Sequence, residues 1–230
     1  MPLSVIIPSR NVNNLIECIA ALRRHDPLPI IVVDDGLDFR RIPDGVTVIP
    51  GVKPFIFARN INLGIQQAGK DDVFLLNDDS LLETRGGFTA IQQAWRNYPQ
   101  FGLIGAAIDD CGTPEQVWRP GGQLRSITTP PVIFAACFIP RRTIDRIGYL
   151  DERFGVNAGG PGTRGYGCED DDYCWRVREA GLLLGVYDGC LVNHTKLKST
   201  FRDDPEHKAD VKIHEALFEK KWGRHPRRPL

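Results

Sequence analysis

The chain lacks several features that would have pointed to a simple function. Its 29 Lys and Arg residues balance its 29 Asp and Glu residues, so a broad attraction to nucleic acid or to a membrane surface is not indicated. The six cysteines include no C-x-x-C pair, which argues against a disulfide framework and a zinc module. No apolar run approaches the roughly eighteen residues of a membrane span. What remains is a globular chain of 230 residues, long enough to bury a substantial core.

The N-terminal residues, Met1–Ile7, lead directly into an apolar run. They lack the basic start and the long apolar stretch of a signal peptide. We therefore expect a cytoplasmic protein.

Short apolar runs alternate with segments of helical periodicity in the first hundred residues. The apolar runs are Leu3–Pro8, Ile30–Val33, Val46–Ile49 and Val73–Leu76, and the helical segments are Leu15–Leu22, Ala58–Ala68 and Gly87–Tyr98. This alternation predicts an α/β fold with a mostly parallel central sheet and helices on both faces.

The second half is less regular. We expect strands at Gly102–Ile108, Ile133–Ile139, Leu182–Tyr187 and Gly189–Val192, and helices at Asp172–Ala180 and Pro205–Trp222. Gly112–Thr129 is typical of a loop or a hairpin excursion. Asn157–Gly167, which contains five glycines, is typical of a mobile loop over a site.

Three polar clusters follow three of the predicted strands. They are Pro8-Ser9-Arg10, Asp34-Asp35-Gly36 and Asn77-Asp78-Asp79. Ligands of open α/β sheets bind beyond the carboxyl ends of the strands, so these clusters should converge on one rim.

Asp34 and Asp35 precede Gly36 at the end of an apolar run. Carboxylates there can accept hydrogen bonds from a base N–H or from ribose hydroxyls. The same residues also suit an ordinary Asp-Gly turn, so both interpretations stay open. Arg10 and Arg59 lie near other strand ends, and guanidinium groups suit the recognition of a diphosphate.

The segment Asn77-Asp78-Asp79 offers oxygen ligands that suit Mg²⁺ or Mn²⁺. Such an ion would bridge a diphosphate and neutralise charge on a leaving group. His194, after another strand-like segment, could complete the metal site with Asp79. The alternative is that Asp79-Ser80 caps the next segment and that His194 is an ordinary histidine.

Four consecutive acids, Glu169–Asp172, follow the glycine-rich segment. Like charges at contact distance destabilise one another, so the run makes sense if the acids meet cations or hydroxyls. A carboxylate acting as general base on an incoming hydroxyl contributes about 10²–10⁴ in rate. The alternative is a solvent-facing helix start, which the helix dipole favours and in which Asp172 and Arg176 form an i,i+4 pair.

Taken together, these motifs resemble the GT-A fold glycosyltransferases of family 2. The matching segments are Ser4–Asn11, Val32–Gly36, Ala58–Asn60, Leu75–Ser80, and Glu169–Asp172 with Arg176, Ala180 and Gly181. The acidic run is also similar to the Trp-Gly-Gly-Glu-Asp-Asp-Asp segment of β-1,4-galactosyltransferases, with Tyr166-Gly167-Cys168 in place of its first three residues.

The resemblance implies a GT-A (Rossmann-like) fold, a nucleotide-sugar donor, a Mn²⁺ or Mg²⁺ cofactor and an inverting displacement. It implies that Asp79 is the metal ligand of the D-x-D motif, with His194 as a second ligand, and that Asp170 is the base and Glu169 an acceptor contact. The first acid of the D-x-D motif is replaced by Asn77. The implied donor contacts are Pro8, Ser9, Arg10, Asp34, Asp35, Arg59, Asn77 and Asp78. The implied acceptor contacts are Tyr166, Gly167, Glu169 and Asp171.

We therefore expect a single domain over residues 1–230, with a donor-binding half (about 1–105), an acceptor half (about 106–200) and a C-terminal helix with a basic tail (201–230). A UDP-sugar is the expected donor. The acceptor is left open among a glycan, a protein, a lipid-linked sugar and modified nucleic acid. A sugar nucleotidyltransferase of related fold and a non-catalytic carbohydrate-binding module are the alternatives. The enzyme interpretation requires that the two acidic segments face each other in one site.

Overall fold

A computed structural model describes residues 1–111, 113–128, 130–155, 167–198 and 205–226, and for 205–211 only the backbone. Its strands are β1 Leu3–Ser9, β2 Ile30–Asp34, β3 Thr47–Pro50, β4 Asp72–Leu76, β5 Leu81–Leu82, β6 Phe101–Ile108, β7 Leu124–Ile127, β8 Ala136–Ile139 and β9 Leu183–Asn193. Its helices are α1 Val12–His25, α2 Phe57–Gln67, α3 Gly87–Asn97, α4 Arg141–Ile147, α5 Glu169–Glu179 and α6 Pro205–Trp222, with a short 3₁₀ turn at Phe39–Arg41.

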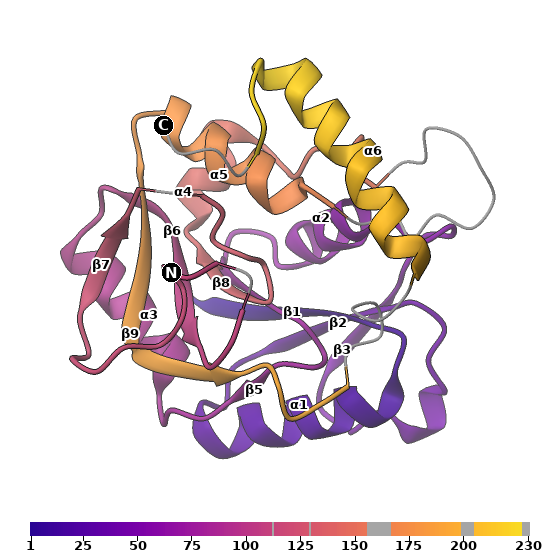
Figure 1. Ribbon diagram of the computed structural model, residues 1–230. Helices are drawn as coiled ribbons and strands as arrows, with labels where there is room; N and C mark the ends of the chain where they lie inside the picture. Colours follow the sequence, from indigo (N-terminus) through magenta and orange to yellow (C-terminus); the bar gives the residue numbers. More distant parts are fainter. Residues whose placement is uncertain (112, 129, 156–166, 199–204, 227–230) are drawn as a thin grey trace.

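One sheet of nine strands carries the fold, in the order β3-β2-β1-β4-β8-β6-β9-β5, with β7 paired to β9 (Figure 1). Strands β1 to β4 are parallel to one another, and so are β6 and β9. Strand β8 is antiparallel to both β4 and β6, so β6 and β9 point the same way as β1 to β4. The predicted α/β fold with a mostly parallel sheet is therefore confirmed. The carboxyl ends of β1 to β4, β6 and β9 lie at one edge of this sheet.

Helices cover both faces of the sheet because the strands bury side chains on both sides. Val5 and Ile7 of β1 face one core, which α1 and α3 close with residues such as Leu15 and Phe88. Ile6 faces the opposite core, which is closed by α2, α4 and α5. Figure 1 shows the two helix layers on either side of the sheet. The prediction that helices lie on both faces is confirmed.

The C-terminal helix α6 adds an outer layer beside α5, drawn in yellow in Figure 1. Phe218 of α6 is fully buried in a small cluster with Phe154, Cys168 and Trp175. Polar contacts reinforce this packing, because the Trp222 indole N–H donates to Asp172 Oδ1 over 2.9 Å. The terminal helix thus packs directly on the helix that carries the acidic run.

Some predicted boundaries differ from the structure. Helix α5 begins at Glu169 rather than at Asp172, so all four acids belong to its first turn. The two strands predicted after residue 182 are one continuous strand, β9. The excursion predicted at Gly112–Thr129 contains β7. The predicted mobile loop Asn157–Gly167 lies outside the described residues except for Gly167.

Among the described residues, no helix combines the length and the apolar character needed to cross a membrane.

Candidate active site at the carboxyl ends of the strands

The three predicted polar clusters lie together at one edge of the sheet. Ser9, the last residue of β1, is in register with Asp34, the last residue of β2, just as the buried Pro8 is with Val33. The Ser9 hydroxyl donates to Asp78 Oδ2 over 2.6 Å, which joins the end of β1 to the turn after β4. The rim expected from the strand-end rule is therefore formed by residues of all three clusters.

Asp34 and Asp35 have different roles in the structure. Asp34 Oδ1 accepts the backbone N–H groups of Gly36 and Leu37, over 2.7 and 2.6 Å, and so closes the turn that follows β2. Asp35 is 6% exposed and pairs with the Lys53 ammonium group. The Arg10 guanidinium lies 4.0 Å from the other oxygen of Asp35.

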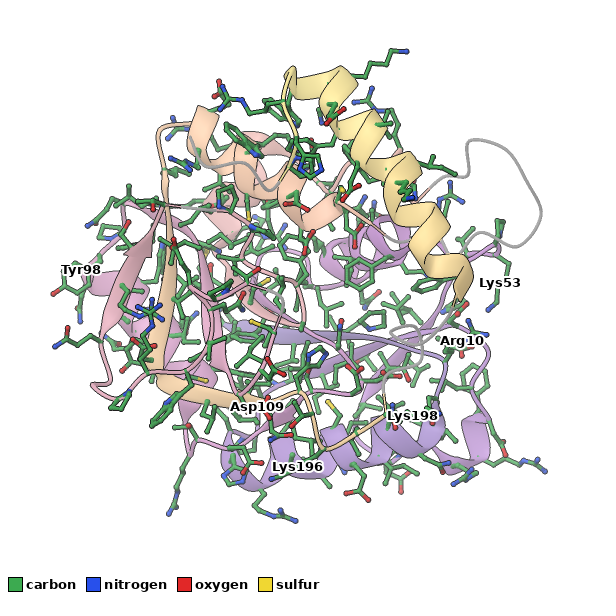
Figure 2. The ribbon with its side chains drawn as sticks, viewed as in Figure 1. Arg10, Lys53, Tyr98, Asp109, Lys196 and Lys198 are labelled. Carbon is green, nitrogen blue, oxygen red and sulfur yellow. The ribbon has the colours of Figure 1, made fainter. Side chains whose placement is uncertain are left out.

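These contacts place two cations at the rim beside one buried carboxylate. Figure 2 shows Arg10 and Lys53 close together at this edge of the molecule. Their side chains are 42% and 61% exposed, so an anionic ligand can reach both in competition with Asp35.

Arg59 is held by an ion pair further along the rim. Its Nε donates to Glu152 Oε2 over 3.1 Å, and Glu152 Oε1 accepts from Asn62 over the same distance. The Arg59 side chain is 29% exposed. A diphosphate role for Arg59 would therefore compete with a carboxylate already in place.

The predicted metal ligands lie next to each other. Asp79 follows β4 and His194 follows β9, and the His194 Nε2 atom is 3.2 Å from Asp79 Oδ1. Asp79 is 5% exposed, and its Oδ1 accepts no hydrogen bond from the residues that the structure describes. This buried oxygen and the facing imidazole nitrogen are stabilised either by a proton on the imidazole or by a cation that both groups bind.

Asp78 is the second acid of this turn and has a perturbed pKa. Burial raises the pKa of Asp78 to about 7, and the negative charge of Asp79 adds to the shift. Hydrogen bonds from the Ser9 hydroxyl and from the backbone at Arg10 and Asn11 oppose it. The turn therefore holds one carboxyl group that titrates near neutral pH.

The acidic run at the start of α5 divides into separate roles. Glu169 is 1% exposed, and its Oε2 accepts the Gly167 N–H over 2.6 Å. Burial raises the pKa of Glu169 well above its usual range, and the neighbouring charge of Asp170 raises it further. Asp172 is fully buried and receives Arg176 Nε over 2.9 Å, so this acid stabilises the helix packing.

Asp170 is the acid of this run that is only partly buried. Its Oδ1 accepts the backbone N–H of Asp171 over 2.8 Å. Cys168, the residue before the helix, has φ +61° and is the one non-glycine with positive φ in the described part of the chain. Such backbone conformations are strained and concentrate at functional sites.

The turn after β4 and helix α5 both contact the segment that leads into β8. The Asn77 N–H donates to Ala135 O over 2.9 Å. The Val132 N–H donates to Cys174 Sγ of α5 over 3.2 Å. Tyr166 lies outside the described residues.

The family model described as Glycosyl transferase family 2 matches residues 4–130, more than half of the chain. The chain belongs to this family. No curated protein matches the chain at a significant level. The family and the enzyme class predicted from the motifs are therefore confirmed.

Two solved structures have a similar fold. GalNAc-T7 with UDP, GalNAc and Mn²⁺ matches with a TM-score of 0.65 and 11% identity, covering 98% of this chain and 52% of the other. The mannosyltransferase PcManGT from Pyrobaculum calidifontis, in complex with GDP-Man and Mn²⁺, also has a TM-score of 0.65, with 14% identity and coverage of 97% and 65%. The family 2 chain thus spans about half to two-thirds of the length of these proteins, and the likeness establishes the fold.

A divalent cation fits the residues of this family 2 site. Asp79 and His194 provide a carboxylate oxygen and an imidazole nitrogen, both common ligands of Mn²⁺, and Asp79 Oδ1 lacks a hydrogen-bond donor. The described residues form no group of three or more His, Cys, Asp or Glu ligands. Donor phosphates and water are suitable ligands for further coordination positions of such an ion.

Two residues of the site were missed by the sequence analysis. Asp109 follows β6 and holds the turn of the predicted metal ligand, because its carboxylate accepts the His194 N–H, the Asn193 amide and the Thr195 hydroxyl over 2.6–2.7 Å (Figure 2). The strand-end rule could have identified Asp109, since the strand predicted at Gly102–Ile108 ends directly before it. Lys53 had no such signal, because only the folded chain brings it to Asp35.

Proposed function

We propose that this family 2 chain is an inverting, metal-dependent glycosyltransferase that moves a sugar from a nucleoside-diphosphate sugar to an acceptor hydroxyl. The observation that carries the proposal is the approach of the buried Asp79 Oδ1 and His194 Nε2 within 3.2 Å at the carboxyl edge of the sheet, where no hydrogen bond from the described residues joins this oxygen. A divalent ion held there would neutralise the charge that develops on the departing diphosphate.

The donor is proposed to lie along the rim from Asp35 to Asp79. Arg10 and Lys53 supply cationic groups for the diphosphate, and Asp35 supplies acceptor oxygens for the nucleoside. Pro8, Ser9 and Asn77 line the same edge, while Asp34 acts through the turn that it closes. The solved neighbours contain UDP in one case and GDP-Man in the other, so both nucleotides belong in the test, with UDP as the first choice.

Asp170 is proposed as the general base. It would accept the proton of the acceptor hydroxyl as that oxygen attacks the anomeric carbon from the face opposite the diphosphate. The transition state has oxocarbenium character, as in glycoside hydrolysis. Glu169, Asp171 and the backbone of Gly167 form the adjoining acceptor contacts. Burial raises the pKa of Glu169, which favours its protonated form.

The experiment that tests this function uses Asp170→Asn. The variant should lose transfer by about 10²–10⁴, the range for removing a general base. Binding of UDP with Mn²⁺, measured by calorimetry, should stay within about threefold, a difference below 1 kcal/mol. Glu179→Gln is the matched control, because it removes an exposed carboxylate from the same helix. Undiminished transfer by Asp170→Asn would remove this residue as the base.

The acceptor, the single-domain division of residues 1–230 and the cytoplasmic location stay predictions. A panel of glycan, peptide and lipid-linked acceptors, each with UDP-sugars and GDP-mannose in the presence of Mn²⁺ or Mg²⁺, addresses the acceptor and the metal together.

A further inference from the structure

A buried histidine of α6, His214, contacts the backbone at two glycines, Gly155 and Gly167. His214 is 2% exposed. Its Nδ1 accepts the Gly155 N–H over 3.4 Å. The ring also lies against Gly167, where an added Cβ would come within 3.0 Å of His214 Cδ2. One side chain of the terminal helix thus touches both Gly155 and Gly167.

The contact with Gly167 leads directly to the acidic run. Gly167 has φ +145°, a conformation that favours glycine, and its N–H donates to Glu169 Oε2 over 2.6 Å. Glu169 is the first residue of α5, next to the proposed base Asp170. A shift of Gly167 would therefore move the hydrogen bond that orients Glu169.

Helix α6 is held firmly enough to act as a support. Lys221 pairs with Asp172 Oδ1 over 2.5 Å and with Asp151 over 2.8 Å. Phe218 is fully buried against Phe154 and Trp175. These contacts fix the helix one and two turns beyond His214, so the position of the imidazole is set by the packing of α6 and by its ion pairs with Asp151 and Asp172.

We propose that His214 is a positioning residue for the acceptor side of the site. Through Gly155 and Gly167 it fixes the backbone that enters α5, and with it the orientation of Glu169 and Asp170. The inference rests on the proposed function for the role of these two acids. According to this proposal the C-terminal helix positions residues of the site. This helix lies beyond residues 4–130, the part of the chain that the family model matches.

Ordinary packing is the competing interpretation of a buried histidine, and a pair of variants separates the two. His214→Leu keeps the bulk of the ring and removes the acceptor nitrogen. His214→Asn places an amide oxygen where Nδ1 lies, so it retains an acceptor for the Gly155 N–H. Phe218→Leu is the matched control, because it weakens the packing of α6 without touching Gly155 or Gly167.

The first measurement is independent of activity. Hydrogen exchange of the full chain, read in peptides that contain Gly155 or Gly167, should rise by about fivefold or more in His214→Leu, the factor for one lost hydrogen bond of about 1 kcal/mol. His214→Asn should exchange like the parent, and Phe218→Leu should change these peptides no more than the rest of α6. Equal exchange in His214→Leu and the parent would overturn the proposal.

The second measurement separates positioning from stability. With whichever donor of the panel is used, His214→Leu should reduce kcat for transfer by about tenfold to a hundredfold, the range for a misplaced reacting group. Metal-dependent hydrolysis of the donor by water should stay unchanged, and His214→Asn should restore transfer.

A parallel fall of transfer and hydrolysis, or an equal fall of transfer in Phe218→Leu, would show that His214 only stabilises α6 and would overturn the proposal. If no donor of the panel is used at all, the proposed function fails, whereas the exchange measurement still decides whether His214 holds the start of α5.

Discussion

The carboxyl group of Asp78 makes the stability of the protein depend on pH in an unusual direction. Burial raises the pKa of this group from 3.8 to about 7 in the folded chain. The folded state therefore holds a proton that the unfolded chain releases. The stabilising contribution of the protonated group is complete below about pH 4, declines as pH rises, and is lost once pH passes about 7. Carboxyl groups whose charged form is stabilised by an ion pair or by hydrogen bonds produce the opposite trend.

The magnitude follows from the shift itself. A difference of about three pKa units corresponds to about 4 kcal/mol between the fully protonated and the fully ionised limits. Between pH 5 and pH 8 the linkage relation gives about 2–3 kcal/mol of this total. Asp78→Asn removes the titration and keeps an oxygen that can accept the Ser9 hydroxyl, whose bond to Asp78 Oδ2 is 2.6 Å long.

The assay is urea unfolding of parent and variant with a chelator present, at pH 5 and at pH 8. The free energy of unfolding of Asp78→Asn, relative to the parent, should increase by about 2–3 kcal/mol from the lower to the higher pH. Asp145→Asn, which neutralises an exposed carboxylate of α4, should show no such change. A relative stability of Asp78→Asn that is constant or decreases over this range would refute the assignment of a raised pKa to Asp78.

Two further predictions concern the proposed metal ligands and the buried Asp172. Asp79→Asn and His194→Ala should each abolish the Mn²⁺ dependence of UDP binding in calorimetry, and retention of that dependence in both variants would contradict the proposed metal site. Asp172→Asn should destabilise the fold by about 3–5 kcal/mol, because it removes a fully buried carboxylate from the partly buried Arg176 guanidinium and leaves Lys221 with Asp151 as its remaining ion-pair partner. Thermal unfolding measures the change in the free energy of unfolding caused by Asp172→Asn. A decrease below about 1 kcal/mol is typical of an exposed ion pair and would contradict the structural role of Asp172.

The N-terminal half could be predicted well because its signals are local. Apolar runs such as Val73–Leu76 mark buried strands, and polar residues directly after them fall at the carboxyl edge. This logic brought Ser9, Asp34 and Asp78 to one rim, where the structure places them. Applied to β6, the same logic would have found Asp109 as well.

The interpretation of the acids depended on contacts that the sequence does not contain. Asp34 closes a turn, whereas Asp35 beside it pairs with Lys53. Asp172 is a buried structural partner, whereas Asp170 two residues earlier is only partly buried. Neighbouring carboxylates of identical chemistry thus acquire different roles, because burial and distant partners set their charge and their accessibility.

The sequence by itself determined the alternation of strands and helices, the polar edge of the sheet and the family, since each depends on residue types at short spacing. Only the tertiary structure decided that His194 meets Asp79, that Lys53 reaches Asp35 and that His214 of the last helix contacts Gly155 and Gly167. Each of these pairs joins segments that come together only when the sheet and its covering helices pack. Their distances are properties of the packed chain and not of any local pattern of residues.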